Sequence, residues 1–440
     1  MRGFINPENV NDIAREVGYY QRERKLSPFD LLCLLISEHH RKDEVSLADY
    51  VWELMNTKKI KISEEGLNKK FTELGVVFME QLLNVALEKM FDGGTARCER
   101  AIRIKDSTSF QCPESMSVKF KGSGGSGSSA GIKIQFDYDP VKGKIFDLSV
   151  GQMAKPDIAD AIESNETINE GDIVIRDLGY VGVEALEKLA GNGGRYLNRL
   201  HQCNVYELDE QLEEMVLLDY KALYKKLKKQ GGKAIDKEIY ITAKKMKTRL
   251  VASLVPEAVY AQRVRKLRKT AQKKGYTVKK DTLFKLRFNL YITNLSSEEI
   301  KAEEVRNIYR LRWQIELVFK AWKSYEHLGK IKDVQTNRVL MELYAKIIWI
   351  LLKTRIERVI VEWGKDNDIP MSKLKIHKRL AKYAASIWDG LRSLMKMLLE
   401  HVDELPKSFK KEIKKNKDGV KYDCEKTLKK LEKTLISRRF

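Results

Sequence analysis

Apolar residues recur at helical spacing through the first part of the 440-residue chain. Segments 27–40, 46–57 and 63–91 show this pattern, and each begins with a serine that can cap a helix. Residues 1–95 are therefore expected to be helical. Two interpretations of this region stay open, a plain helical bundle and a helix-turn-helix module.

An alternation of apolar and polar residues follows the helical region. Segments 100–106, 131–139 and 142–150 predict three antiparallel strands, and segment 172–180 predicts a fourth strand that leads into a helix. Strands mixed with helices in this order favour a mixed α/β sheet domain over residues 96–194.

The next region, residues 195–300, is expected to be mostly β. Segments 195–208, 237–255 and 283–295 alternate, and the strongly basic segment 257–275 between them predicts a helix. The sequence thus indicates a β-rich insertion that carries one cationic helix.

From residue 301 to the end, the apolar spacing is again mostly helical, first over 301–375 and then over a basic C-terminal region, 376–440. The most apolar run, 343–363, is broken by several charged residues. It predicts a buried core helix, since a membrane span needs about 20 predominantly apolar residues.

Charge changes the picture, because Lys and Arg number 83 against 62 Asp and Glu, for a net charge of +21. A chain this basic is expected to bind a polyanion, with nucleic acid as the first candidate and an anionic membrane surface as the second. The N-terminal residues lack the apolar segment of a secretory signal, and the five cysteines form no C-x-x-C pair. We expect a cytoplasmic, nucleoid-associated protein whose residues 1–95 bind DNA.

Two aspartates lie where strands are predicted to end, Asp106 in "IRIKDSTS" and Asp177 in "IVIRDLGY". Aspartate is common at such turns, so either residue alone carries little information. If the two strands are neighbours, however, the carboxylates converge and can hold Mg²⁺. Other acidic residues compete for this role: Asp137, Asp139, Asp147, Asp157, Asp160 and Asp172.

The segment "YRLRWQIELVFKAWK", residues 309–323, predicts an amphipathic helix at about 100° per residue. Its expected core stripe consists of Leu311, Ile315, Val318 and Trp322. The opposite face gathers one acidic residue among basic and aromatic ones: Tyr309, Arg312, Trp313, Glu316, Lys320 and Lys323. A surface ion pair between Arg312 and Glu316 would explain only two of these residues. A metal-binding carboxylate flanked by DNA-binding groups would explain all of them.

The spacing Y-x2-R-x3-E-x6-K in this segment resembles the Y-R-E-K signature of DDE transposases of the insertion-sequence-four family. Asp106 in its D-S-T context and Asp177 in D-L-G-Y resemble the first two acidic residues of that family. Segments 65–78 and 121–139 also resemble one branch of it. The resemblance therefore covers most of the chain.

The resemblance implies an RNase H-like catalytic core, 96–194 and 301–375, interrupted by a mostly β insertion. Asp106, Asp177 and Glu316 would bind two Mg²⁺ ions, for which Mn²⁺ can substitute. It further implies cut-and-paste transposition by a homodimer that binds double-stranded DNA, both at the terminal inverted repeats of the element and at the target. Five DNA-contacting positions are expected on the Y-R-E-K face: Tyr309, Arg312, Trp313, Lys320 and Lys323. Phe288, in the insertion, is expected to be a sixth.

Phe288 is a departure from the family pattern. In well-understood relatives a tryptophan stands 21 residues before the signature tyrosine and stacks on a base flipped out during hairpin formation. Here that position is Phe288. Phenylalanine still offers a π-face to a base, so a hairpin intermediate is an expectation of the resemblance.

Three other functions stay open at this point. One is an RNase H-like nuclease without strand transfer, another is a non-catalytic DNA-binding protein derived from a transposase, and the third is a peripheral membrane protein. The Gly/Ser-rich segment 122–131 allows two interpretations as well, a mobile loop near a phosphate backbone and a long hairpin connection.

Overall fold

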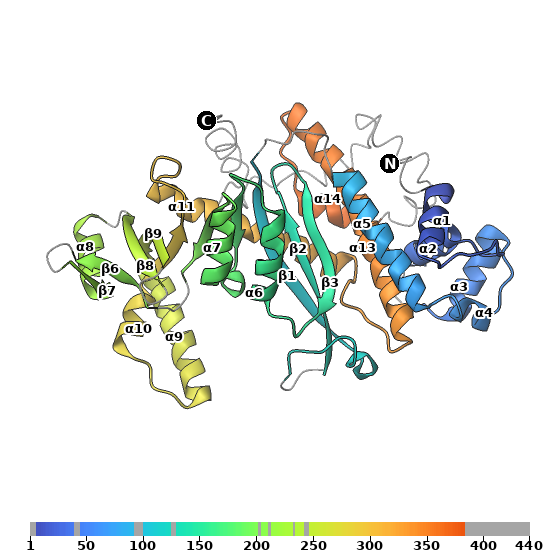
Figure 1. The fold of residues 1–440 in the computed structure, drawn as a ribbon, viewed down its shortest axis with the longest axis horizontal. Coiled ribbons are helices and arrows are strands. Elements are labelled where there is room, and N and C mark those ends of the chain that lie inside the picture. The colour runs from blue at the N-terminus through green and yellow to red at the C-terminus, as the bar shows by residue number, and fades with distance from the viewer. Residues whose placement is uncertain are drawn as a thin grey trace.

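The computed structural model describes residues 6–38, 45–91, 100–124, 129–200, 204–209, 213–231, 234–241 and 246–382. Its N-terminal part is helical, as the apolar spacing predicted, and forms one end of the molecule (Figure 1). The elements of this part are α1 (Pro7–Glu16), α2 (Pro28–Glu38), α3 (Leu47–Glu53), η1 (Leu54–Lys58), α4 (Glu64–Asn68) and α5 (Glu73–Phe91).

The predicted serine caps are confirmed. Ser46 accepts a hydrogen bond from the amide of Asp49, and Ser63 accepts one from the amide of Gly66 at 3.1 Å. Ser27 caps the following helix by accepting from the amide of Asp30 at 3.0 Å. Each cap satisfies an amide that has no partner within its helix, which fixes where the helix begins.

A single mixed sheet runs from the centre of the molecule into the opposite end (Figure 1). Its strand order is β3-β2-β1-β4-β5-β10-β9-β8-β6-β7, with β1, β4 and β5 parallel to one another and the other pairs antiparallel. The strands are β1 (Ile102–Cys112), β2 (Ala130–Tyr138), β3 (Ile145–Gln152), β4 (Ile173–Arg176), β5 (Arg195–Arg199), β6 (Tyr206–Asp209), β7 (Glu214–Leu217), β8 (Ile235–Ile241), β9 (Met246–Leu254) and β10 (Phe288–Thr293). The predicted mixed α/β class is confirmed.

One predicted strand end is wrong. The first strand does not end at Asp106 but continues to Cys112. Its partner β2 pairs with it from Ile104 onward along its whole remaining length, whereas β4 pairs only from Ile102 to Lys105. Asp106 thus lies inside a strand, at the point where the parallel pairing stops.

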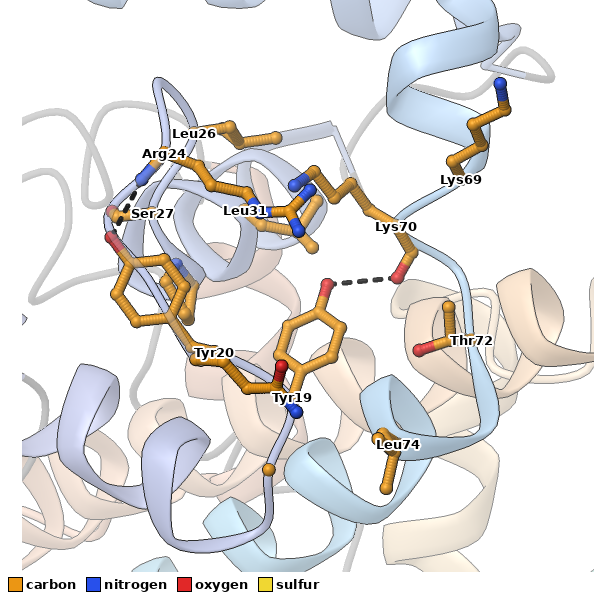
Figure 2. Close-up of a pocket in the computed structure, with 13 residues that line it drawn as sticks. Tyr19, Tyr20, Arg24, Leu26, Ser27, Leu31, Lys69, Lys70, Thr72 and Leu74 are labelled. Atoms are coloured by element: carbon orange, nitrogen blue, oxygen red, sulfur yellow. Dashed lines mark hydrogen bonds between the residues drawn. The ribbon is translucent and has the colours of Figure 1, made fainter.

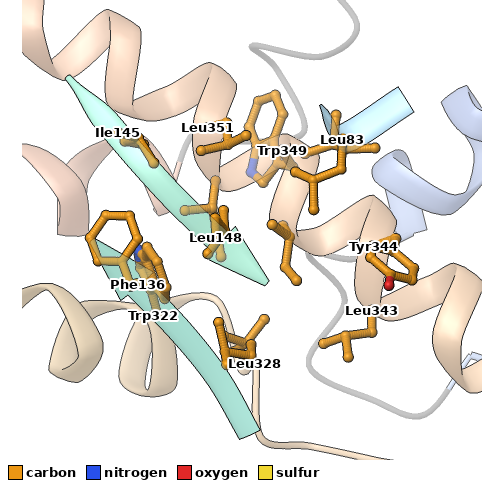
Figure 3. Close-up of a cluster of buried hydrophobic side chains, with 14 of the residues drawn as sticks. Leu83, Phe136, Ile145, Leu148, Trp322, Leu328, Leu343, Tyr344, Trp349 and Leu351 are labelled. Carbon is orange, nitrogen blue, oxygen red and sulfur yellow. The ribbon is translucent and has the colours of Figure 1, made fainter. Parts of the chain in front are cut away.

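Helices cover both faces of the central strands. The remaining helices are α6 (Asp157–Ser164), α7 (Val183–Gly191), α8 (Tyr220–Lys229), α9 (Glu257–Lys274), α10 (Lys280–Lys285), α11 (Ala302–Tyr309), α12 (Trp313–Tyr325), α13 (Thr336–Asp366) and α14 (Lys373–Lys382), with short 3₁₀ turns η2 (Glu114–Met116), η3 (Asn165–Thr167), η4 (Leu178–Tyr180) and η5 (Arg310–Arg312). The largest hydrophobic cluster joins β1–β3 to α12, α13 and the N-terminal helices. Within it, the ring centre of Phe136 lies 4.9 Å from that of Trp322, and Trp349 of α13 belongs to the same cluster (Figure 3).

The apolar run 343–363 lies within α13, and most of its side chains are buried, which confirms the prediction of a core helix. In the part of the chain that the structure describes, no helix is both long and apolar enough to cross a bilayer. Charged residues in this helix have specific partners. Lys353 is fully buried and contacts the equally buried Glu326, which also lies 2.9 Å from His377 Nε2. The other ring nitrogen of His377 contacts Glu357, so the cluster joins the end of α12 to α13 and α14.

Candidate active site

The register of the parallel strands brings two of the predicted acidic residues together. β1 and β4 pair from Ile102 with Ile173 to Lys105 with Arg176, so the next step along both strands sets Asp106 beside Asp177. Alternation also places these two residues on one face of the sheet, because Ile104 and Ile175 belong to the cluster that packs against α12 and α13. The two strands are neighbours, which is the condition under which the two carboxylates converge.

Asp106 is held in place by its own surroundings. Its Oδ1 accepts a hydrogen bond from the amide of Ser107 at 2.8 Å. Burial raises the pKa of Asp106 to about 6, partly opposed by this hydrogen bond and by the charge of Arg312. Burial disfavours the charged form of this carboxylate, so a nearby cation is needed to stabilise the charge.

A single guanidinium joins the predicted acidic triad. Arg312 Nη1 donates to Asp106 Oδ2 at 2.8 Å, its Nη2 donates to Glu316, and its Nε lies 4.0 Å from Asp177 Oδ1. Burial lowers the pKa of Arg312, but Tyr309 and the three carboxylates outweigh burial and raise it. The pair between Arg312 and Glu316 exists, yet it belongs to a set of four charges drawn from β1, the end of β4 and the segment that begins α12.

The donor chemistry of this triad suits a divalent ion, since carboxylate oxygens are the ligands that Mg²⁺ prefers. Within the ranges that the structure describes, no group of three His, Cys, Asp or Glu side chains is arranged to hold a metal ion. The reason lies in the contacts of Arg312, because two carboxylates turn to its guanidinium and the third lies 4.0 Å away, instead of all three sharing one point. The three side chains are of the type that binds Mg²⁺, and they lie close to one another. To bind an ion together, they would have to exchange their contacts with Arg312 for contacts with the ion.

The helix predicted over residues 309–323 is interrupted. α11 ends at Tyr309, the turn η5 follows, and α12 begins at Trp313. The buried stripe of the segment is Leu311, Ile315, Phe319 and Trp322, with Val318 only partly buried. The 3₁₀ turn advances about 120° per residue rather than 100°, so a uniform helical wheel misplaces residues across it.

Tyr309 lies against the sheet rather than on an open helix face. It is 7% exposed, and its ring centre lies 5.2 Å from that of Tyr291 in β10. Its hydroxyl is buried and has no hydrogen-bond partner among the described residues. Burial raises its pKa, so the group stays a neutral donor. A buried donor without a partner is costly, and a ligand oxygen would satisfy it.

The other predicted DNA-contacting residues differ in their placement. Trp313 is 56% exposed and Lys320 is exposed, so both are accessible from solvent. Lys323 Nζ donates to the carbonyl of Ser109 on β1 at 3.1 Å, three residues beyond Asp106. Phe288 is different, because it is 3% exposed in a second hydrophobic cluster, with its ring 6.1 Å from that of Tyr220. The structure therefore does not offer the ring of Phe288 to a base.

Sequence reasoning missed a group of arginines beside the triad. Arg199 ends β5 one step beyond Asn198, which pairs with Arg176, so Arg199 continues the row of Asp106 and Asp177. It pairs in turn with Tyr291. Burial raises the pKa of Tyr291, and nearby arginines oppose this effect: Arg199, Arg306, Arg263 and Arg310. Nothing in the sequence pointed to Arg199, because the alternating segment 195–208 predicts a strand that continues past it, whereas β5 ends there.

The competing aspartates have structural partners instead. Asp137 binds Arg103 at 2.6 Å inside the core, and Asp139 accepts from the amide of Val141 at 2.7 Å. The remaining four contact a lysine or a backbone amide: Asp147 and Asp160 with Lys105, Asp157 with Lys133, and Asp172 with the amide of Ala101. These contacts account for the competing aspartates without catalysis.

Three carboxylates from two parallel strands and a helix lie around one arginine, on a mixed sheet covered by helices. This arrangement is consistent with the class of enzymes that have an RNase H-like core. Residues 97–352 match the family model described as "Transposase DDE domain". The chain belongs to the DDE transposases, and it is of the insertion-sequence-four-like kind.

Curated relatives are described as transposases of insertion sequence elements. The chain is 32% identical over 375 residues to "Transposase for insertion sequence element IS231F" from Bacillus thuringiensis subsp. israelensis. The matched region covers 80% of this chain and 78% of the relative. It is 29% identical over 429 residues to the IS231D transposase from Bacillus thuringiensis subsp. finitimus, covering 92% and 87%. It is 26% identical over 401 residues to the IS1151 transposase from Clostridium perfringens, covering 85% and 83%.

Proposed function

We propose that this transposase moves an insertion sequence by a cut-and-paste route, with Asp106, Asp177 and Glu316 as its catalytic carboxylates. The observation that carries the proposal is the convergence of these three residues on one guanidinium. In this route a strand is nicked at each end of the element, and the freed 3′-hydroxyl later attacks target DNA. A nuclease without strand transfer is the alternative, and it would cut the ends but leave pre-cut ends unjoined to target DNA.

The triad is proposed to hold two divalent ions, Mg²⁺ or Mn²⁺. Bound there, the ions would supply Lewis-acid activation of the attacking oxygen and stabilise the leaving oxygen. Asp106, fixed by the amide of Ser107, and Asp177 would approach them from the sheet, and Glu316 from α12. Arg312 then exchanges its carboxylate partners for a DNA phosphate, for which a planar guanidinium is well suited.

The DNA next to the cut is proposed to lie along the Y-R-E-K face. The buried hydroxyl of Tyr309 would donate to a phosphate oxygen, and Lys323 would contact the same strand. The exposed Trp313 and Lys320 would meet bases or backbone further out. The arginines around Tyr291 extend this cationic surface on the other side of Asp177.

The hairpin step of the route stays a prediction. Phe288 is buried against Tyr220 and gives this step no support in the conformation described. Denaturing gels of cleaved element ends would test it directly, since a hairpin end migrates as one strand of doubled length. A homodimer that pairs two ends is proposed as the active assembly, and the mass of the protein–DNA complex would test it.

The basic helix α9 is proposed to contact the DNA backbone. Of its 18 residues only Ala271 is buried, and the exposed side chains include Arg265, Lys266, Arg268 and Lys269. Replacing these four with glutamine should weaken duplex binding and flatten its salt dependence, because log K changes with log salt by about 0.9 per phosphate contacted. The measurement is a binding titration at several salt concentrations.

The matched control removes the same charge from the same insertion. Lys221, Lys225, Lys226 and Lys229 are exposed on α8, and their replacement by glutamine changes the net charge equally. We expect a smaller loss of affinity and a smaller change in slope. An equal loss in both variants would show that only net charge matters and would remove α9 from the proposed interface.

A further inference from the structure

A cavity of about 260 Å³ lies in the N-terminal helices, far along the chain from the triad. Its wall is formed by residues 18–31, which lead from α1 into α2, and by residues 69–74, which lead into α5 (Figure 2). Gly18 permits the sharp turn after α1, with a φ of 76°. The cavity is open and polar, so it suits a charged ligand better than an apolar one.

The lining of this cavity is cationic and contains no acidic residue. Arg24 and Lys70 point toward one another above the ring of Tyr19, while Lys69 points away (Figure 2). Among the described residues, Arg24 and Lys70 form no ion pair, whereas Lys69 binds Glu65 at 2.6 Å. Burial and the charge of Arg24 lower the pKa of Lys70. Two like charges that face each other without a counter-ion favour an anionic ligand.

Side-chain contacts link the segments that carry these two cations. Tyr19 donates its hydroxyl to the carbonyl of Lys70 at 3.0 Å, and its ring stacks on Phe78 of α5 with centres 5.3 Å apart. Thr72 caps α5 by accepting from the amide of Gly75 at 3.1 Å. The site is therefore built from three parts of the chain that hydrogen bonds and ring stacking hold together, which reduces the entropy lost when a ligand binds.

We propose that Arg24 and Lys70 bind one backbone phosphate of duplex DNA in this cavity, away from the cut. The inference rests on the proposed function, because it takes the DNA as the substrate of the transposase. DNA phosphate is favoured over a free anion because Arg24 lines the cavity and is exposed to solvent, so a phosphate carried on a duplex can reach it. Two cations on one phosphate position the duplex without reading its sequence.

The test compares the double variant Arg24→Gln, Lys70→Gln with Lys69→Gln in the full-length protein. Binding of a duplex that carries the element end is titrated at several salt concentrations in EDTA, so that no cleavage occurs. We expect the double variant to lose affinity about ten-fold at 0.1 M salt, as for a lost charged hydrogen bond. Its salt slope should fall by about one. Lys69→Gln should change neither quantity appreciably, and Arg24→Lys should keep the wild-type slope because it keeps the charge.

The outcomes separate this inference from the proposed function. Wild-type protein that fails to bind the duplex would overturn both. Wild-type binding with equal slopes for the double variant and Lys69→Gln would overturn this inference alone. Inorganic phosphate is the second probe. If it raises the melting temperature of the wild type but not of the double variant, while DNA binding is unchanged, the cavity is a site for free phosphate and the DNA assignment is wrong. Circular dichroism of each variant confirms its fold.

Discussion

The variant Glu316→Gln is expected to lose DNA cleavage by about 10³-fold or more and to keep its binding of element ends. Glutamine has the shape of glutamate, so α12 and its buried stripe should be undisturbed, and Arg312 Nη2 can still donate to the side-chain oxygen. The negative charge needed for a divalent ion is gone, however. Cleavage is measured with an end-labelled duplex in Mg²⁺ on a denaturing gel, and binding by gel shift.

The control for this variant is Glu303→Gln, the same chemical change at an exposed position in the first turn of α11. It should cleave like the wild type, because Glu303 has no role in the triad. Normal cleavage by Glu316→Gln in Mg²⁺ would show that Glu316 is not a catalytic carboxylate, and the proposed mechanism would fall. Loss of binding together with cleavage would indicate a folding defect instead.

Replacing Lys353 with methionine should destabilise the protein by about 3–5 kcal/mol, because it leaves the buried carboxylate of Glu326 without its cation. Both side chains are 0% exposed, and water cannot take over the interaction. Adding Glu326→Gln to this variant should recover much of the loss, since the uncompensated charge disappears while His377 keeps an acceptor. Denaturant unfolding, monitored by circular dichroism, gives the free energies.

A surface pair on the same helix provides the comparison. Arg358 and Glu362 lie 2.9 Å apart and are about half exposed, so Arg358→Met should cost at most about 1 kcal/mol. If Lys353→Met costs no more than Arg358→Met, the buried cluster does not hold α12 and α13 together as the contacts indicate.

The sequence predicted the acidic triad because its motifs are local. Asp177 follows a four-residue strand and Glu316 lies in a helix with the Y-R-E-K spacing, and both features can be seen within a few residues. It also predicted the helices of the N-terminal part from their apolar spacing and caps. The core strands were visible because period-two alternation distinguishes them from helices.

What the sequence did not reveal depends on contacts between distant segments. The extension of β1 beyond Asp106 follows from pairing with β2, and the place of Arg199 beside Asp106 and Asp177 follows from pairing with β4. The central position of Arg312 requires three elements to meet. The burial of Phe288 reflects packing with Tyr220 in α8, which no local pattern encodes.

The path of the sheet has a consequence for how such proteins can vary. The chain leaves the core at the end of β5 and returns on β10, and the amide of Leu200 donates to the carbonyl of Leu290 at 2.9 Å. The two points where the intervening 89 residues join the core are therefore hydrogen-bonded neighbours, so this segment can lengthen or shorten without displacing the strands that carry Asp106 and Asp177. A single residue added within β4 has the opposite effect, because it would turn Asp177 to the other face of the sheet. The fold therefore tolerates changes in the length of the segment between Leu200 and Leu290, but not the insertion of a single residue in the strands beside it.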